Sequence, residues 1–435
     1  MTEDATARLE SMCRADGINH VFVEFPDLNG LSRSKQLDAD YFLSSYEDGI
    51  SMNLALITQT PRSDVVEGSA YGDAIDYADG LVYPDPRTCR RVPWRDDAVR
   101  VICDFEYDGK PVGGAPRTVL KRVVERVRDA GFDPFAGSEL ECYLLDPTED
   151  GYVPATSDKH ENLTQATEEV ASFYDLVYEW AAAFDLDVNT LHHEFGAGQI
   201  EILFDYGDPL GQADRTFRFK PLVKQAARAC DQHATFMAKP FTDSAGSGYH
   251  LHTSLFEDGE NVLEGEDGLS ETGRHFVGGL LAHADALTAF GTPNLNGFKR
   301  HEPNSFAPYT ASWGHGNRMT AVRVPAYGTT RIENRIASAD ANPYLVIAST
   351  LAAGLHGIEA ELEPPAPSSG DPANERPRLP RTPHQAVDAL EADEVLRDAL
   401  GENAVTEYVR MKRQEIDSFY DQTTAWERAQ YLETL

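Results

Sequence analysis

The chain is organised around Gly137-Ser138-Glu139-Leu140-Glu141-Cys142-Tyr143-Leu144-Leu145-Asp146, a stretch in which polar and apolar side chains alternate. Successive side chains of an extended strand point to opposite faces. Glu139, Glu141 and Tyr143 therefore share one face, and the apolar side chains between them share the other. Two carboxylates on one buried face repel each other, and a bound divalent cation usually offsets this repulsion. The stretch predicts a strand with an apolar back and a cation-binding front.

Three later stretches repeat this alternation, with isoleucine or leucine behind a polar front. Their fronts carry Gln199 and Glu201; His250, His252 and Ser254; and Arg331, Glu333 and Arg335. Any one of them is also compatible with a half-exposed strand that has a solvated face. Solvated faces seldom collect His and Glu at metal-ligand spacing, so the four stretches together predict one sheet facing a polar funnel.

Length and composition restrict the class of protein. A chain of 435 residues with 41% hydrophobic content is long enough for more than one domain with a proper core. Mean hydropathy is −0.43, and no apolar run is long enough to cross a membrane. The N-terminus lacks the pattern of a signal peptide, so we expect a cytoplasmic protein. The five cysteines are scattered and odd in number, which argues against a disulfide framework or a thiolate zinc site.

The net charge is −34, from 72 acidic and 38 basic residues. Such a charge repels nucleic acids and anionic membranes, so neither is an expected partner. Aromatic content is an ordinary 10%, which argues against disorder as the explanation. We interpret the acidic excess as a halophilic surface whose self-repulsion is screened by high salt.

Two domains are expected. Residues 1–107 predict a small α+β domain, with a helix at 5–15 and strands at 21–25, 32–37, 80–86 and 99–105. A Gly/Pro-rich linker follows, and Pro116 then opens a helix. Residues 108–435 predict a second domain, in which helices at 167–184, 217–233, 275–290 and 342–355 alternate with the funnel strands. A proline-rich loop at 363–383 precedes a charged helical tail at 384–435.

Four motifs match the glutamine synthetase family in order and spacing. They are Gly-x-Glu-x-Glu at 137–141, His-Glu-x-Gly-x-Gly-Gln-x-Glu at 193–201, Gly-x-His-x-His-x-Ser at 248–254 and Arg-Ile-Glu-x-Arg at 331–335. Each motif alone is weak evidence for the family, but the four motifs in this order and spacing are highly specific for it. The chain resembles this family over almost its whole length. The resemblance implies an α+β fold: an N-terminal β-grasp domain, then a catalytic domain with a curved antiparallel sheet and surrounding helices.

The resemblance also implies ATP as a substrate and two divalent cations, Mg²⁺ or Mn²⁺. One cation would be held by Glu141, Glu194 and Glu201, and the other by Glu139, His250 and Glu333. Carboxylate oxygens with one imidazole suit such metals.

Further site residues follow from matching positions. Arg300 and Arg335 would grip the glutamate substrate, with Gly246 allowing close backbone approach. Arg318, Arg323, Arg331 and His252 would surround the transferred phosphate, and Ser254 would line the nucleotide pocket along with Arg323 and Arg331.

The implied reaction explains this set of residues. A carboxylate is a poor acyl donor, so ATP converts it to an acyl phosphate, which an amine then displaces. Phosphoryl transfer depends on positioning and charge neutralisation, hence metals and arginines. The family's active site is completed by a neighbouring subunit, so we expect a homo-oligomer, with a double-ring dodecamer as the specific prediction.

Two positions depart from the ammonia-using members. Phe306 stands where they carry a flap glutamate, and Asn53 aligns with an aspartate that the neighbouring subunit presents. An aromatic side chain suits a bulkier amine, as in the γ-glutamylpolyamine and γ-glutamylamide synthetase branches that the chain resembles. The prediction is an ATP-dependent glutamate–amine ligase. The alternatives are glutamine synthetase using ammonia and a catalytically silent, regulatory relative.

Four polar residues near these motifs are given structural interpretations. We interpret His192 as a strand or loop residue that packs locally. His301 and His315 are interpreted as exposed loop residues, and Glu302 as a surface residue of the flap.

Overall fold

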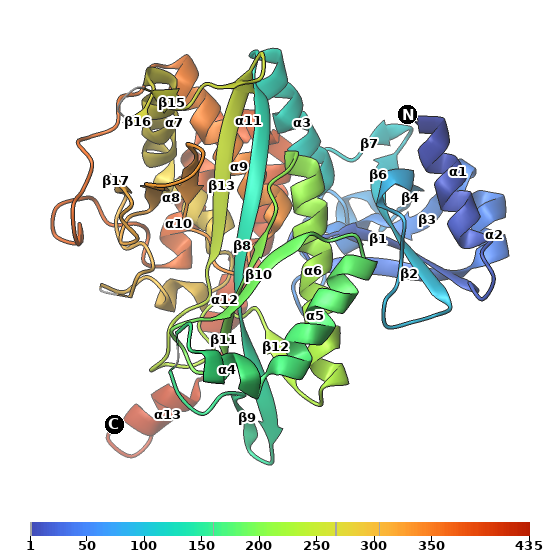
Figure 1. Ribbon diagram of the computed structural model, residues 1–435, viewed down its shortest axis with the longest axis horizontal. Helices are drawn as coiled ribbons and strands as arrows, with labels where there is room; N and C mark the ends of the chain where they lie inside the picture. Colours follow the sequence, from blue (N-terminus) through green and yellow to red (C-terminus); the bar gives the residue numbers. More distant parts are fainter. Residues whose placement is uncertain (1, 160, 266–267, 304) are drawn as a thin grey trace.

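The computed structural model describes residues 2–159, 161–265, 268–303 and 305–435. A smaller N-terminal part and a larger C-terminal part lie side by side, each built on its own sheet (Figure 1). The two chain ends lie at opposite sides of the molecule (Figure 1). No helix in the described ranges is long and apolar enough to span a membrane.

The N-terminal sheet has the strand order β2-β1-β6-β4-β3, with β5 and β7 added against β6. Its strands are β1 (His20–Pro26), β2 (Ser32–Asp38), β3 (Ile50–Asn53), β4 (Asp79–Pro84), β5 (Arg90–Arg91), β6 (Ala98–Tyr107) and β7 (Lys110–Pro111). Its helices are α1 (Thr2–Cys13) and α2 (Ala39–Ser45), with the short 3₁₀ turns η1 (Tyr46–Asp48), η2 (Leu54–Ile57), η3 (Asp73–Ile75) and η4 (Pro86–Thr88). The pairing of β1 with β6 is parallel, and the other pairings are antiparallel.

The hairpin turn between β1 and β2 joins the two parts of the chain. Gly30 has φ +75°, a left-handed conformation that glycine adopts without strain. A Cβ there would lie 3.0 Å from the Cα of Asn342, so the turn can approach closely only with glycine. Asn342 in turn donates hydrogen bonds to the carbonyls of Asp27 and Leu28. The turn between β1 and β2 is therefore also a contact between the two parts of the chain.

The second sheet has the order β10-β11-β8-β13-β19-β18-β17, with β9 and β12 paired to β8 and β14 to β13. Its strands are β8 (Asp133–Thr148), β9 (Gly151–Pro154), β10 (Val188–His193), β11 (Gln199–Phe204), β12 (His233–Thr235), β13 (Tyr249–Glu257), β14 (Glu260–Asn261), β17 (Trp313–His315), β18 (Val322–Val324) and β19 (Ile332–Asn334). The four alternating stretches are the adjacent strands β11, β8, β13 and β19, so the prediction of one shared sheet is confirmed.

Helices pack around the apolar back of this sheet (Figure 1). The helices of the C-terminal part are α3 (Pro116–Asp129), α4 (Thr164–Glu169), α5 (Ala171–Ala183), α6 (Pro209–Ala229), α7 (Glu271–Ala282), α8 (Ala284–Gly291), α9 (Pro343–Glu359), α10 (Pro383–Ala392), α11 (Glu394–Leu400), α12 (Glu402–Tyr420) and α13 (Ala425–Tyr431). The turn η5 (Gly297–Lys299) and the small pair β15 (Glu264–Gly265) and β16 (Gly268–Leu269) complete the described elements. Leu140, Cys142 and Leu251 lie in the core, as the alternation predicts.

Three helix boundaries differ from the sequence prediction. α6 begins at Pro209, eight residues earlier than expected, because Asp208 caps its first turn by accepting from the amide of Gly211. The predicted helix at 167–184 is two helices that break at Val170. The predicted helix at 275–290 breaks at His283, whose side chain bonds Asp393. Periodicity alone does not report such breaks.

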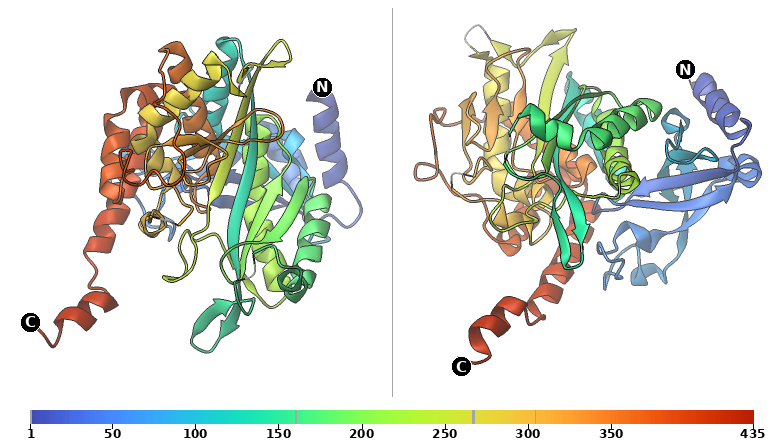
Figure 2. Two further views of the ribbon diagram at one scale, coloured as in Figure 1. Left: turned by 60° about the vertical axis from the view of Figure 1, so that its left-hand side comes forward. Right: turned by 60° about the horizontal axis from the view of Figure 1, so that its bottom comes forward.

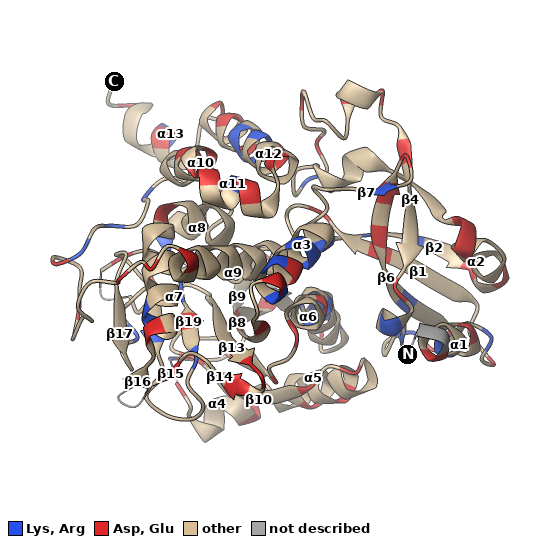
Figure 3. Cartoon of the chain, turned by 90° about the horizontal axis from the view of Figure 1, so that it is seen from above, with Lys and Arg blue, Asp and Glu red and all other residues tan. Residues whose placement is uncertain are grey.

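The C-terminal end of α12 and the whole of α13 project away from the body (Figure 2). This C-terminal arm exposes Phe419, Tyr420, Trp426, Tyr431 and Leu432. The acidic residues are scattered over helices and strands of both parts of the chain (Figure 3).

Candidate active site

Strand register brings the front side chains of β8, β11 and β13 together. Glu141 on β8 lies opposite Glu201 on β11, and Glu139 lies opposite His250 on β13. Directly opposed side chains on one face of a sheet lie close enough to interact. The side chains of Glu139, Glu141, Glu201 and His250 therefore form one buried cluster, which we call the funnel cluster.

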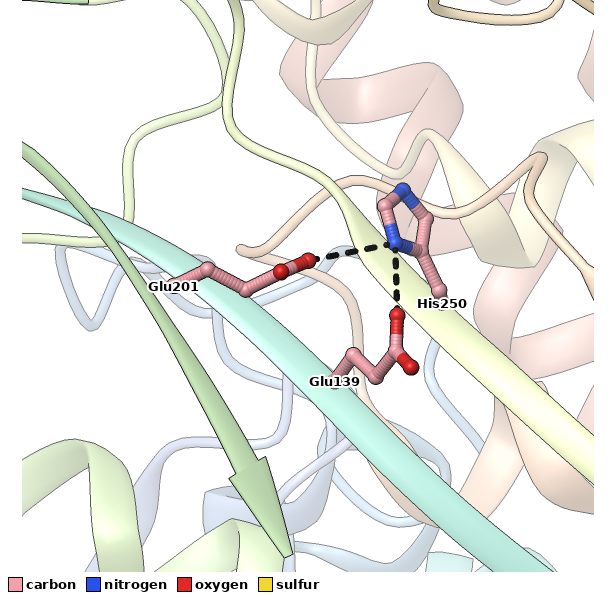
Figure 4. A group of neighbouring side chains, drawn as sticks. All are labelled: Glu139, Glu201 and His250. Atoms are coloured by element: carbon pink, nitrogen blue, oxygen red, sulfur yellow. Dashed lines mark hydrogen bonds and ion pairs between the residues drawn. The ribbon is translucent and has the colours of Figure 1, made fainter. Parts of the chain in front are cut away.

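His250 is the centre of the funnel cluster (Figure 4). Its Nδ1 lies 3.3 Å from Oε2 of Glu139 and 3.6 Å from Oε1 of Glu201, and its Nε2 lies 3.6 Å from Oε1 of Glu141. Burial and Arg335 lower the pKa of His250, but its hydrogen bonds to Glu139 and Glu201 outweigh them and raise it to about 9. An imidazolium thus stands among the three carboxylates.

The carboxylates respond to their neighbours in different ways. Burial raises the pKa of Glu139, but hydrogen bonds from His250 and His252 hold it well below its usual range. Burial raises the pKa of Glu141, and nearby Glu201 adds to this increase. One oxygen of Glu141 is already occupied, because Oε2 accepts from Gln199 Nε2 and from the Gly248 amide, both at 2.8 Å.

His192 is a strand residue, as interpreted, but its side chain joins the funnel cluster and does not merely pack locally. It lies on β10 directly opposite Glu201. Its Nε2 lies 3.2 Å from Oε1 of Glu194 and 3.1 Å from Oε2 of Glu201. Hydrogen bonds to Glu194 and Glu201 raise the pKa of His192 to about 10. The overlooked signal is spacing: His192 precedes Glu194 by two residues and so shares its face.

Three groups of side chains bring enough donor atoms together to hold a cation. The groups are Glu139, Glu201 and His250; Glu139, His252 and Glu333; and His192, Glu194 and Glu201. They contain five of the six predicted metal ligands, divided differently from the prediction. Glu141 is not in these groups, and its Oε2 accepts from Gln199 and Gly248. Carboxylate and imidazole donors in this number fit Mg²⁺ or Mn²⁺.

Glu333 joins two arginines beside the cluster. It is fully buried on β19, opposite His252. Its Oε1 lies 2.5 Å from Nη1 of Arg335, and its Oε2 lies 2.8 Å from Nη1 of Arg323. Burial raises the pKa of Glu333, but Arg335 and the neighbouring histidines lower it to about 2.

Glycines leave room beside Arg300 at the base of the funnel. A Cβ at Gly246 would lie 2.7 Å from Cγ of Arg300. A Cβ at Gly248 would lie 2.8 Å from Nε2 of His250 and 3.1 Å from Oε1 of Glu141. Arg300 is buried, and its guanidinium donates to the carbonyl of Ile336 at 3.1 Å. The close approach of Arg300 and His250 to this loop therefore favours glycine at both positions. Approach of the glutamate substrate to the loop backbone stays a prediction.

A cleft of about 800 Å³ opens next to the funnel cluster. It is lined by Glu139, His252, Ser254 and Arg331, and Nε of Arg331 lies 3.2 Å from Nδ1 of His252. The sequence reasoning missed the aromatic walls of the cleft, which are Phe135, Tyr206 and Phe256. Two of them could have been found, because Phe135 and Phe256 extend the same alternating faces of β8 and β13.

Several predicted residues lie outside the cluster. Arg318 is exposed before β18 and makes no side-chain hydrogen bond among the residues that the structure describes. Asn53 caps η2 in the N-terminal part, where it donates to the Tyr77 carbonyl. Phe306 is 57% exposed and has φ +57°. Glu302 is exposed, as interpreted.

Of the two histidines interpreted as exposed, His315 is exposed but His301 is not. His301 is buried, and its ring nitrogens lie 2.9 Å from Thr292 Oγ1 and 2.6 Å from the Pro308 carbonyl. Burial, with Arg300 nearby, lowers the pKa of His301 to about 3. Its place in a loop gave no sign of these partners.

Comparison with known proteins decides the family. The family model of the glutamine synthetase catalytic domain matches residues 113–431. The chain belongs to the glutamine synthetase family. Glutamine synthetase of Pyrococcus abyssi is 37% identical over 94% of this chain and 95% of its own length. Glutamine synthetase of Halobacterium salinarum is 34% identical over 100% of this chain and 97% of its own length. The γ-glutamylethanolamide synthetase GlnA4 of Streptomyces coelicolor is 32% identical over 98% of this chain and 95% of its own length.

Solved structures of the glutamine synthetase family share the fold. The GmaS/ADP complex superposes with a TM-score of 0.87 and 32% identity, covering 98% of this chain and 99% of that chain. A glutamine synthase homolog superposes with a TM-score of 0.83 and 27% identity, covering 94% of this chain and 97% of that chain. The resemblance and the fold class are thereby confirmed. The chain is a glutamine synthetase-type, ATP-dependent ligase, of a family that uses glutamate, ATP, divalent metals and an amine or ammonia.

Proposed function

We propose that this ligase joins the γ-carboxylate of glutamate to an amine larger than ammonia, through a γ-glutamyl phosphate. The observation that carries the proposal is Phe306. It stands where the ammonia-using members resembled here carry a glutamate; its side chain is exposed, and its backbone carbonyl accepts a hydrogen bond from Arg335, the arginine proposed to bind glutamate. An exposed aromatic ring offers a larger amine both apolar surface and a cation–π partner.

The funnel cluster would hold the two divalent cations. Glu194 and Glu201, with Glu141 beside them, would hold one; Glu139, His250 and Glu333 would hold the other. His192 lies close enough to Glu194 and Glu201 to join the first set. Bound there, the cations would supply charge neutralisation for phosphoryl transfer. The buried, closely spaced carboxylates support this assignment, since a bound cation would offset the repulsion among them.

Arg300 and Arg335 would bind glutamate beside the loop that carries Gly246 and Gly248. A guanidinium can bind a carboxylate with two parallel hydrogen bonds. Both arginines are buried, so a glutamate carboxylate here would be held away from water. This shielding would protect an acyl phosphate from hydrolysis.

The adjoining cleft would take ATP. Ser254 and Arg331 line it, and the aromatic rings at its wall offer a surface for a nucleobase. Arg323 and Arg331, with His252 between the cleft and the cluster, would face the phosphates. Arg318 would have to turn inward from its exposed position to assist them.

The part of the site that would receive the amine lacks the two carboxylates that would bind and deprotonate ammonium, since Phe306 and Asn53 stand at those positions. Asn53 would come from a neighbouring subunit and contributes no charge. His301 cannot serve as the base, because both ring nitrogens are engaged and its pKa is about 3. Glu302 is the remaining flap carboxylate, and its Oε2 lies 4.0 Å from Nζ of Lys239.

The second candidate is glutamine synthetase using ammonia. The glutamine synthetases of Pyrococcus and Halobacterium named above favour it, because they match this chain at 34–37% identity. A catalytically silent relative is disfavoured by the assembled cluster and by the paired arginines on Glu333.

We further propose a double-ring dodecamer in a cytoplasm of high salt. The exposed aromatic residues of the C-terminal arm support assembly, since an apolar surface that projects from the body needs a partner to cover it. The net charge of −34 supports a high-salt environment.

The deciding experiment is a comparison of kcat/KM for ammonium, ethylamine, putrescine and ethanolamine under one set of high-salt conditions, with phosphate release as the common readout. We expect an alkyl amine to exceed ammonium. A clear advantage for ammonium would make the protein a glutamine synthetase with a relocated base. Glutamate-dependent ADP release without any amine tests the phosphorylation step separately.

A further inference from the structure

The side chain of Gln199 lies at the front of β11, two residues before Glu201 and directly opposite Tyr143 on β8. It is 1% exposed, and the proposed reaction gives it no role. A glutamine amide has two N–H donors and one carbonyl acceptor, and leaving a buried one without a partner is costly. The partners of Gln199 therefore identify the groups that it holds in place.

The amide nitrogen of Gln199 donates to two different parts of the site. Nε2 donates to Oε2 of Glu141 at 2.8 Å and to the carbonyl of Gly246 at 3.1 Å. Oε1 accepts from the amide of Gly196 at 2.9 Å. Because the nitrogen meets two acceptors and the oxygen meets a donor, the orientation of the amide follows from its partners. One side chain thus joins a carboxylate of the funnel cluster to the glycine loop.

The bond from Gln199 helps to decide which oxygen of Glu141 faces the funnel cluster. Oε2 also accepts from the amide of Gly248 at 2.8 Å, so two donors hold it. Oε1 lies 3.6 Å from Nε2 of His250, at the centre of the cluster. A carboxylate whose one oxygen is held presents the other in a fixed direction, as the outer partners of metal-binding side chains ensure.

The glycine loop is held at a second point by Tyr143. Its Oη lies 2.8 Å from the carbonyl of Ala245 and 2.7 Å from Oγ of Ser244. Among the residues that the structure describes, the hydroxyl bonds this loop and, at 3.5 Å, Oε1 of Gln199, but not Glu141. Removal of this hydroxyl would therefore loosen the loop and leave the bonds to Glu141 in place.

We propose that Gln199 is a positioning residue that holds Glu141 and the Gly246 loop in one fixed arrangement, so that a cation and the glutamate substrate bind in register with each other. The inference rests on the proposed cation and glutamate sites and holds for any amine acceptor. Fixing the two sites relative to each other matters because reacting groups must be aligned before the reaction. A glutamine with a structural role alone would affect stability and neither ligand.

Gln199→Met tests the proposal, because it keeps the length and the burial of the side chain but removes both donors. We expect Mn²⁺ affinity to fall by about 10–100-fold and KM for glutamate to rise by about tenfold or more, as for loss of the outer partner of a metal ligand. KM for ATP should stay unchanged, since Gln199 does not line the adjoining cleft. Titration calorimetry with Mn²⁺ and steady-state phosphate release with the best amine are the readouts.

Two matched controls separate this effect from loss of packing. Tyr143→Phe should raise KM for glutamate and keep Mn²⁺ affinity, because it loosens the loop alone. Gln232→Met removes another glutamine bond to a carboxylate of β8, from Nε2 to Oδ1 of Asp146 at 2.9 Å, and should change neither quantity.

Gln199→Asn is the second test variant and decides the matter if Gln199→Met does not fold. It keeps the amide but is one methylene shorter, so it cannot hold both acceptors, and the same two changes are expected.

The outcomes separate this inference from the proposed function. A wild-type protein without Mn²⁺ binding, or without glutamate-dependent ADP release, would overturn the proposed function and this inference with it. If the wild type shows both, and the Gln199 variants keep Mn²⁺ affinity and KM for glutamate or lose only Tm, the inference alone is wrong. Loss of glutamate binding without loss of Mn²⁺ affinity, as in Tyr143→Phe, would also overturn it, because Gln199 would then act on the loop alone.

Discussion

The backbone carbonyl of Phe306 accepts a hydrogen bond from Nη2 of Arg335, at 3.4 Å. Arg335 is buried and paired with Glu333, whereas the ring of Phe306 is 57% exposed. The flap is thus tied to the funnel through its backbone, and the side chain at this position is left free. A substitution at 306 can change the acceptor surface without removing this contact.

Phe306→Glu should shift the enzyme toward ammonia. A carboxylate would give ammonium a charge-assisted hydrogen bond worth ~1.5–3 kcal/mol and could act as a general base, which contributes ~10²–10⁴-fold. We expect the ratio of kcat/KM for ammonium to that for ethylamine to rise by at least about tenfold. Steady-state phosphate release with each amine measures it.

Phe306→Tyr and Phe419→Glu are the matched controls for this substitution. The first keeps an aromatic ring in the flap, and the second places the same new charge on α12, away from the funnel. Neither should alter amine preference. An unchanged ratio in Phe306→Glu would show that this position does not select the acceptor.

Glu201→Gln should abolish turnover and leave the fold intact. The change keeps the side-chain volume but removes a charge from the cluster of Glu139, Glu201 and His250. We expect kcat to fall by more than about 10²-fold, with Mn²⁺ affinity reduced in parallel. Tm should stay close to wild type, because the loss of one carboxylate also relieves repulsion on Glu141. Titration calorimetry with Mn²⁺ and Tm are the readouts. Glu302→Gln, on the exposed flap, should keep Mn²⁺ affinity.

His301 should make the protein sensitive to mild acid. Its pKa is about 3 in the folded chain and 6.5 when unperturbed, so below pH 6.5 the unfolded chain takes up a proton that the folded chain does not. Stability from this group is therefore fully present above pH 6.5 and lost as the pH falls toward 3. Between pH 7 and pH 5 the loss is about 2 kcal/mol.

Denaturant unfolding of wild type and His301→Gln at pH 5, 6 and 7 tests this. The variant should lose part of the acid dependence, whatever its stability at pH 7, while His315→Gln, at an exposed position, should retain it. Parallel pH curves for wild type and His301→Gln would contradict the buried position of His301.

Oligomer size should depend on salt. At about 0.1 M salt the screening length is about 10 Å, and at about 1 M it is about 3 Å, so the repulsion from a net charge of −34 per chain is fully expressed only in dilute buffer. Sedimentation velocity should show a large assembly in molar KCl that dissociates as salt is withdrawn. A species of constant size throughout would argue against a halophilic surface, and an active monomer in high salt would argue against the ring.

Sequence reasoning succeeded where a local pattern has one physical meaning. Glu139, Glu141 and Glu201 could be placed on the polar front of one sheet because a strand alternates with period two, and the structure then shows Glu141 directly opposite Glu201. Proline at the first helical position likewise marked the start of α3.

The rest depends on partners distant in the chain. His192 meets Glu201 only because β10 pairs with β11, and His301 is buried only because Thr292 and Pro308 enclose it. The break between α7 and α8 is accompanied by a bond from His283 to Asp393, 110 residues away. No periodicity within a helix or loop reports such contacts, so these features required the structure.

Glu333 is one carboxylate shared by two arginines. Arg335 lies on the proposed glutamate side, and Arg323 on the proposed phosphate side. An anion that draws Arg335 away from Glu333 leaves the whole carboxylate to Arg323, and the converse holds for an anion at Arg323. If both anions bind as proposed, the two ligands are therefore thermodynamically coupled. Whatever factor one ligand imposes on the affinity for the second, the second must impose on the first.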